Sequence, residues 1–298
     1  MPRYYFDLTD DKVIHDLKGQ KFADLNEARL QSLRKLYPSL KTYTNAFDLI
    51  RATDIDAVVI ATPVSSHFEL ALATLESGKH VLVEKPITDN TADAAELAEM
   101  AAEKELILQV GHVERFNPVL GALEKHLTHP RFIEAHRLRP YAERGTDIGV
   151  VLDLMIHDLE VILHFVRSPL WSIDAVGVPV LSRSEDIASA RLHFEDGCVA
   201  NVTASRISPE RMRKIRIFQE DAYLSLDYQN QSGEIYRRVG RQIWRDRVEI
   251  EHEEPLKLQV TSFIECANTG RQPRVSGSQA TAALELAVKI TKQIASSA

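Results

Sequence analysis

Short apolar runs alternate with longer amphipathic stretches over the first 112 residues. Buried strands are predicted at Ala57–Ala61, at Val81-Leu82-Val83 and at Leu106–Val110, because each run is short and ends at turn residues. Helical patterns lie between these runs. Strands and helices that alternate in this way form right-handed crossovers, so this part of the chain is predicted to build a parallel sheet.

Capping residues mark where the helices of this part begin and end. The predicted helices are residues 26–37 after Asn26, Phe47–Ala52 after Asn45, a helix from Ser65 or Ser66 to Gly78, and a helix from Asn90 to about Lys104. Asn90 and Asp93 have the spacing of a capping box. Thr42–Thr44 is predicted to be a short strand.

After residue 112 strands predominate, which indicates a largely antiparallel sheet with helices on one face. The predicted strands are Ile133–Leu138, Ala175–Val180, Ile187–Phe194, Val199–Ser205, Lys214–Phe218, Tyr223–Asp227, Glu234–Arg238 and Ile243–Ile250. The predicted helices are Pro118–His126, Val151–Val166, Leu256–Asn268 and Ser276–Ser296. The expected organisation is α/β, with a dinucleotide-binding domain at 1–112 and an α+β domain at 113–298 for substrate binding and oligomerisation.

The composition of the chain disfavours several classes of function. A net charge of −7 disfavours nucleic acid and anionic membrane surfaces as partners. Cys198 and Cys266 form neither a disulfide framework nor a metal motif, which fits a cytoplasmic protein without a metal site. The sequence contains no apolar run long enough for a membrane helix.

Polar residues follow the predicted parallel strands, where ligands of open α/β sheets bind. They are Asp24, Thr62-Pro63, Glu84-Lys85-Pro86 and Gly111-His112. We expect them to lie close together. Asp24 is placed to accept hydrogen bonds from a ribose, although an acid at a helix N-terminus has the same pattern. Lys85 is a candidate for chemistry, or a surface lysine at a strand end.

In the second half, Asp153 and His157 are four residues apart within an apolar helical segment. A carboxylate that orients an imidazole is a general acid/base arrangement, and a structural pair or a helix cap at Asp153 has the same spacing. Several arginines could bind phosphate or belong to a solvated face. They are Arg115, Arg137, Arg139, Arg144, Arg206, Arg211 and Arg213.

Taken together, these motifs resemble the Gfo/Idh/MocA oxidoreductases. The matching segments are residues 57–63, Ser66-His67, residues 78–81, Glu84-Lys85-Pro86, residues 110–112 and Asp153-Leu154-Met155-Ile156-His157. The resemblance implies a nicotinamide-binding Rossmann domain and an α+β domain that covers the nicotinamide. It assigns Lys85, Asp153 and His157 to catalysis.

The resemblance also implies binding roles. The cofactor would contact Asp24, Thr62, Pro63, Glu84, Lys85, Gly111 and His112. An acid at position 24 favours NAD over NADP. Residues 111–118, 151–158, 203–206 and 218–225 resemble the branch that oxidises C3 of UDP-N-acetylglucosamine in lipid A biosynthesis. Arg115, Asn117 and Arg206 are then expected to bind the UDP-sugar. Either His157 or Lys85 could be the base.

The amino-terminal segment departs from the family pattern. Only 23 residues precede Asp24, with Gly19 as their single glycine, so the first βα unit and its Gly-rich turn are lacking and the Rossmann-type sheet is expected to be incomplete. We hypothesise that the first 20 or so residues come from a truncated or frame-shifted gene. The alternatives are a dehydrogenase of a free sugar or cyclitol, and a catalytically inactive binding protein. A homodimer or homotetramer formed through the second-domain sheet is expected.

Overall fold

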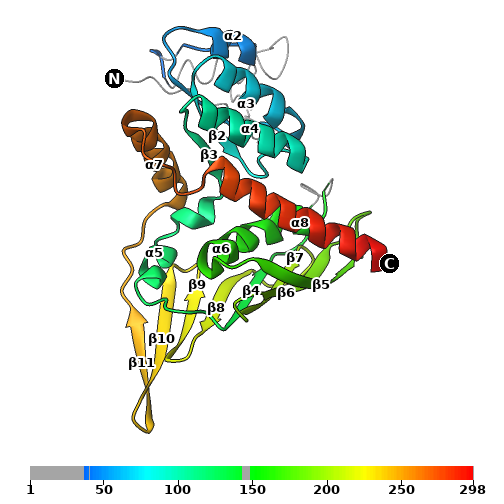
Figure 1. Cartoon of the computed structure of the whole chain (residues 1–298), viewed down its shortest axis with the longest axis vertical. Coiled ribbons are helices and arrows are strands. Elements are labelled where there is room, and N and C mark those ends of the chain that lie inside the picture. The colour runs from blue at the N-terminus through cyan, green and yellow to red at the C-terminus, as the bar shows by residue number, and fades with distance from the viewer. Residues whose placement is uncertain (1–36, 40, 143–147, 298) are drawn as a thin grey trace, which may run out of the picture.

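In the first half of the chain, three parallel strands form a sheet. The computed structural model describes residues 37–39, 41–142 and 148–297. Within these residues β1 (Ala57–Ile60), β2 (His80–Glu84) and β3 (Leu108–Gly111) pair in the order β1-β2-β3. Helices α2 (Ala46–Arg51), α3 (His67–Glu76) and α4 (Thr91–Glu103) alternate with the strands (Figure 1). The predicted parallel sheet is confirmed.

The capping residues act as the sequence predicts. Asn45 accepts a hydrogen bond from Phe47 N, and Asn90 accepts one from Asp93 N. Gly78 follows α3 with φ of +72°, a conformation that glycine adopts without steric cost. The short strand predicted at Thr42–Thr44 is wrong, since these residues have no sheet partner among the described strands. The helix predicted at 26–37 lies almost wholly outside the described residues.

A large, mainly antiparallel sheet forms most of the second half, as predicted. Its order is β11-β10-β9-β8-β4-β7-β6-β5, and the β4–β7 pair is parallel. The strands are β4 (Phe132–Leu138), β5 (Leu170–Val178), β6 (Ile187–Phe194), β7 (Val199–Ser205), β8 (Met212–Phe218), β9 (Ala222–Asp227), β10 (Ser232–Val239) and β11 (Gln242–Val248). The helices are α5 (Pro118–Glu124), α6 (Ile156–Val166), α7 (Pro255–Thr269) and α8 (Gly277–Ser297), with short 3-10 turns at Val64–Ser66 and Val113–Phe116.

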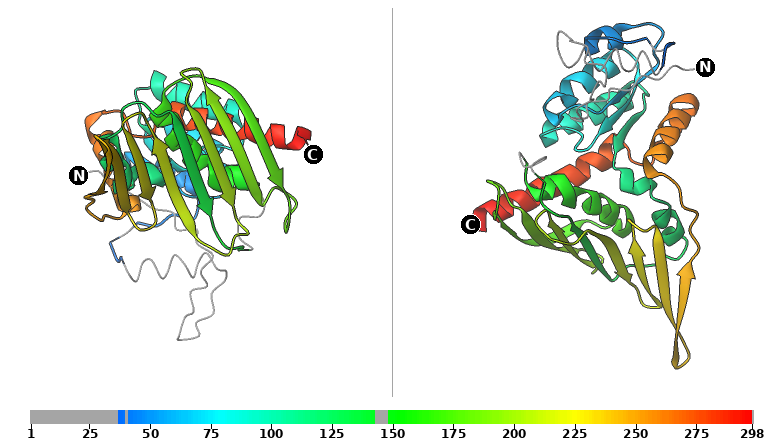
Figure 2. Two further views of the ribbon diagram at one scale, coloured as in Figure 1. Left: turned by 90° about the horizontal axis from the view of Figure 1, so that it is seen from below. Right: turned by 180° about the vertical axis from the view of Figure 1, so that it is seen from behind.

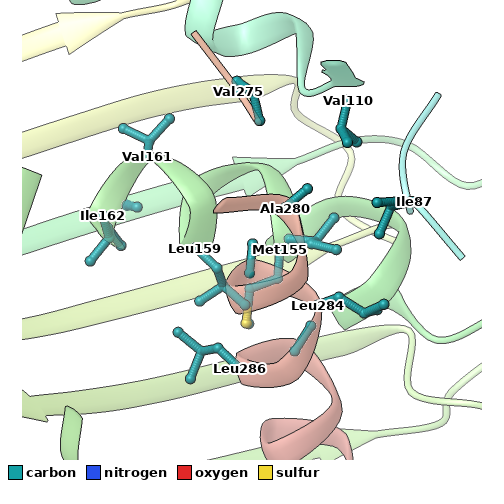
Figure 3. Packing of buried hydrophobic residues seen from close by; sticks show 14 of the residues in the cluster. Ile87, Val110, Met155, Leu159, Val161, Ile162, Val275, Ala280, Leu284 and Leu286 are labelled. Carbon is teal, nitrogen blue, oxygen red and sulfur yellow. The ribbon is translucent and has the colours of Figure 1, made fainter. Parts of the chain in front are cut away.

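Helix α8 packs against both sheets. It contacts α4 on one side and α6 and β5 on the other. Figure 3 shows Met155 and Leu159 beside Ala280 and Leu284 of α8 within the buried core. In Figures 1 and 2, α6 and α8 lie along one face of the large sheet, and none of the described helices covers its other face.

Helix α7 corrects the sequence interpretation, which grouped it with the second half. Phe263 and Cys266 of α7 pack in a buried cluster with Ala57, Leu82 and Ile107 of the parallel-sheet region. Gln109 of β3 also donates a hydrogen bond to the carbonyl of Gln259. The helix therefore returns to the first sheet and covers its second face. Sequence periodicity indicates that α7 has an apolar side, but it does not indicate which sheet that side packs against.

The predicted helix 151–166 is confirmed in extent but begins differently. Its first five residues, Val151–Met155, are π-helical, and the α-helix starts at Ile156. A π-helical turn closes hydrogen bonds to the fifth residue, so its side chains point in directions that the usual helical spacing does not predict. Elsewhere, no helix in the described ranges is both long and apolar enough to cross a lipid bilayer.

The packing of α7 makes a testable prediction. Phe263→Ala should lower the free energy of unfolding by about 3–5 kcal/mol, because it removes a fully buried ring between α7 and the parallel sheet. Leu256→Ala, on the same helix at a side chain that is 51% exposed, should change it by less than about 0.5 kcal/mol. Urea titrations of the three proteins measure both effects. Equal losses in the two variants would contradict this packing.

Candidate active site

The carboxyl ends of the parallel strands bring the predicted cofactor residues to one edge. Thr62-Pro63 follows β1, Lys85 follows Glu84 at the end of β2, and His112 follows Gly111 at the end of β3. Neighbouring strand order and the pairing of Glu84 with Gly111 set these segments side by side. Asp24, the predicted ribose acid, lies outside the described residues, as does Arg144.

Gly111 is needed at the end of β3 because Glu84 occupies the adjoining space. A Cβ atom on Gly111 would lie 2.6 Å from the carboxylate carbon of Glu84. Gln259 of α7 donates a hydrogen bond to Glu84 Oε1 at 3.3 Å. Burial raises the pKa of Glu84, and the Gln259 hydrogen bond opposes that rise. Glu84 is thus held between the end of β3 and helix α7.

His67 joins two of these segments, a function that sequence reasoning missed. Its Nδ1 lies 2.8 Å from the carbonyl oxygen of Pro86, and its Nε2 lies 2.8 Å from that of Thr62. The ring is buried at the start of α3. It therefore fixes the end of β1 relative to the end of β2. The signal was present, since a histidine directly follows the serine predicted to cap this helix.

Lys85 connects the parallel sheet to the second half of the chain. Its Nζ donates to the carbonyl oxygen of Asp153 at 2.7 Å and lies 3.4 Å from Asp153 Oδ1. Arg139 Nη2 donates to the other carboxylate oxygen of Asp153 at 2.7 Å. Burial lowers the pKa of Lys85, while Asp153 opposes that shift. The ammonium is part-exposed, with 20% of the side chain accessible.

The expected orientation of His157 by Asp153 is not found. The Asp153 carboxylate is engaged by Lys85 and Arg139, and His157 Nδ1 is buried without a hydrogen-bond partner. The reason is the π-helical turn at Val151–Met155, which changes the direction of Asp153 relative to the α-helical His157. Asp153 therefore contacts Lys85 and Arg139, whereas His157 contacts His112.

His157 faces a second histidine. The ring centroids of His112 and His157 are 5.9 Å apart with an interplanar angle of 83°. Burial, followed by the charge of Lys85, lowers the pKa of His157 well below its usual value. The same two causes lower the pKa of His112 to about 3. Both rings are therefore neutral near pH 7, and Lys85 lies near enough to influence each of them.

A buried ionic network holds α6 in place behind His157. Arg137 of β4 makes a bidentate contact with Asp158, with distances of 2.8 and 2.9 Å, and donates to Glu114 at 2.8 Å. Arg115 donates to Glu160 at 2.8 Å. Burial raises the pKa of Glu160 to about 7. Asp158 and Glu160 had no assignment from sequence, and their contacts show that they anchor the helix.

The three residues predicted to bind substrate are used inside the fold. Arg115 is buried against Glu160. Asn117 caps α5 through Val119 N and donates to the carbonyl of Tyr228. Arg206 is fully buried, where it contacts Asp186 and Ser182. These contacts correct the sequence prediction, which could not distinguish an arginine buried in an ion pair from one that faces a ligand.

The arrangement suits a nicotinamide cofactor and an alcohol substrate. Three strand ends form the edge at which open α/β sheets bind dinucleotides, and Lys85 presents a part-exposed donor there. A neutral imidazole lies near that ammonium. In the described ranges, no group of three His, Cys, Asp or Glu side chains is arranged to hold a metal ion.

Comparison with known proteins agrees with this geometry. Residues 11–112 match the model of an oxidoreductase family with an NAD-binding Rossmann fold, and residues 123–225 match the Gfo/Idh/MocA C-terminal domain. UDP-N-acetylglucosamine 3-dehydrogenase from Acidithiobacillus ferrooxidans is 41% identical over 186 residues, which span 62% of this chain and 59% of that protein. Myo-inositol 2-dehydrogenase from Thermotoga maritima is 26% identical, over 95% of this chain and 90% of that protein.

A solved structure extends the first likeness to most of the fold. The structure of UDP-N-acetylglucosamine 3-dehydrogenase GnnA from Acidithiobacillus ferrooxidans superimposes with a TM-score of 0.85 at 32% identity. The match covers 91% of this chain and 88% of that one. The chain therefore belongs to the Gfo/Idh/MocA family of oxidoreductases.

Proposed function

We propose that this protein oxidises a secondary hydroxyl group of a UDP-linked sugar, at C3 of UDP-N-acetylglucosamine, with NAD as the cofactor. The observation that carries the proposal is the bond from Lys85 Nζ to Asp153, since it brings the cofactor edge and the helix of His157 to one site. Similarity to the Acidithiobacillus enzyme supports the substrate. Asp24 supports NAD over NADP, because an acid at that position accepts hydrogen bonds from an unphosphorylated ribose.

In this mechanism His157 and Lys85 have different roles at the substrate hydroxyl group. His157 takes the hydroxyl proton at Nε2, because Nδ1 is enclosed and the ring is neutral. Lys85 donates a hydrogen bond to the same oxygen and stabilises the alkoxide charge that develops there. Asp153 and Arg139 fix the position of Lys85. The bound nicotinamide supplies the hydride acceptor.

The roles of base and charge stabiliser could also be exchanged. Burial lowers the pKa of Lys85, so more of the amine would be unprotonated and able to accept a proton than in an exposed lysine. His157 is our choice because its neutral form already predominates near pH 7. Lys85 as an ammonium then has the charge that an alkoxide requires.

A free cyclitol is the second candidate substrate. It is favoured by the similarity to the Thermotoga myo-inositol 2-dehydrogenase, which extends over most of both chains. NADH formation with UDP-N-acetylglucosamine and with myo-inositol distinguishes the two candidates. A chain that binds both ligands without turnover would instead be an inactive member of the family.

We further propose that the chain forms two domains, with the boundary at about residue 112 and α7 returning to the first of them, and that the protein forms a homodimer or homotetramer through the uncovered face of the large sheet. A row of aromatic side chains crosses this face from β4 to β10: Phe132, Phe218, Tyr223 and Tyr236. Burial of such a row against a second copy would remove apolar surface from water. Sedimentation velocity measures the oligomeric state of the protein in solution.

Substitution of either proposed catalytic residue tests the mechanism. Lys85→Met and His157→Asn should each lower kcat at least about 10²-fold, since each removes a group that acts on the hydroxyl. Lys104→Met and His252→Asn are matched controls, because both side chains are exposed and lie outside the candidate site and the large sheet. The controls should keep normal turnover. Full turnover in both site variants would exclude this acid–base scheme.

The pH behaviour of His157 gives a second test. Its imidazole should titrate well below pH 6.5, and Lys85→Met should move that titration to higher pH. The sign follows because loss of a nearby positive charge makes the protonated ring less unfavourable. NMR of labelled histidine side chains, with His157→Asn for assignment, measures the shift. Lys104→Met should leave it unchanged, and an unshifted signal in Lys85→Met would contradict the proposed proximity.

A further inference from the structure

Arg213 is a guanidinium that the proposed chemistry does not yet use. It lies on β8, directly opposite Arg137 of β4, so both side chains point to the helix-covered face of the large sheet. Further along β8, Ile215 and Ile217 on the same face are fully buried. The Arg213 side chain is 51% exposed. The covered face therefore opens to solvent at Arg213.

That opening is at the candidate active site. Arg213 lies 3.5 Å from Glu114, which is two residues after His112, the residue that faces His157. Lys85 and Arg139 are also part-exposed in this region. The charge of Arg213 makes a small contribution to the lowered pKa of His157, after the larger effects of burial, Lys85, Arg137 and His112. These contacts place the guanidinium beside the proposed reaction centre.

The pairing of Arg213 within the fold is weak. Glu114 Oε1 accepts a hydrogen bond from Arg137 at 2.8 Å, and Arg213 reaches the same oxygen only at 3.5 Å. Within the described ranges, the Arg213 side chain makes this ion pair and no hydrogen bond, while its backbone carbonyl accepts one from Tyr228 N. By contrast, Arg137 donates hydrogen bonds from Nε and Nη2 to Asp158 and from Nη1 to Glu114. The donors of Arg213 are therefore available to a ligand.

We propose that Arg213 binds the diphosphate group of the sugar-nucleotide substrate. This inference rests on the proposed function and identifies a residue for the part of the substrate that does not react. A guanidinium has the planar donor pair that matches phosphate oxygens. The diphosphate contact would position the sugar so that its hydroxyl group reaches Lys85 and His157. It replaces the role that sequence reasoning gave to Arg115 and Arg206.

Binding of UDP and of uridine tests the proposal by calorimetry. Arg213→Ala should raise the Kd for UDP about tenfold or more, and Arg213→Lys should raise it less. The Kd for uridine, which lacks phosphate, should not change. Arg271→Ala is the matched control: Arg271 lies outside the large sheet, is 67% exposed and forms an ion pair with Glu265 at 3.1 Å. Thermal melting of each variant establishes that it is folded.

Several results would overturn the inference. Equal Kd values for UDP in Arg213→Ala and Arg271→Ala would do so, as would an equal loss of uridine affinity in Arg213→Ala. A loss of NAD affinity without a loss of UDP affinity would assign Arg213 to the cofactor pyrophosphate instead. If the wild type oxidises UDP-N-acetylglucosamine while Arg213→Ala keeps its KM, the proposed function stands and this inference fails. If the wild type binds no UDP and oxidises only cyclitols, both fail.

Discussion

The contact between Lys85 and Asp153 is the constraint on which the site depends. It joins residues 68 positions apart, one at the end of the parallel sheet and the other in the π-helical turn before α6. A lysine ammonium that is mostly removed from water needs a nearby acceptor, since burial disfavours its charge. Asp153 supplies both a carbonyl and a carboxylate oxygen. One polar contact thereby sets the cofactor edge against the second half of the chain.

The buried ionic network gives His157 a fixed support. Two arginines and three carboxylates lie almost wholly out of water behind α6: Arg115, Arg137, Glu114, Asp158 and Glu160. Such groups require close partners, because a buried charge without one is strongly destabilising. The bidentate contact of Arg137 with Asp158 fixes the residue next to His157. The position of the imidazole is thus set by its neighbours in the helix rather than by a hydrogen bond of its own.

Much of the fold could be predicted because local signals agree with the tertiary structure. Asn90 and Gly78 act where their side-chain and backbone preferences place them, and the short apolar runs form the predicted parallel strands. The motifs also indicated the family correctly. The roles predicted for Lys85 and His157 stay predictions, although the structure does bring Lys85 to Asp153. Sequence could not foresee the π-helical turn, because the same residues have ordinary helical periodicity. It also could not separate Arg206, buried in an ion pair, from Arg213, which is half exposed.

The return of α7 to the parallel sheet has a consequence for how the molecule can be divided. Phe263 and Cys266 cover a face of that sheet from a position late in the chain. A fragment ending near residue 112 would leave Leu82 and Ile107 bare on that side, and its partner fragment would carry an unmatched apolar helix. Neither piece would be an autonomous folding unit. The two sheets are separate, but α7 from the second half of the chain packs on the first sheet. Recombination between relatives would therefore have to exchange α7 together with the parallel sheet that it covers.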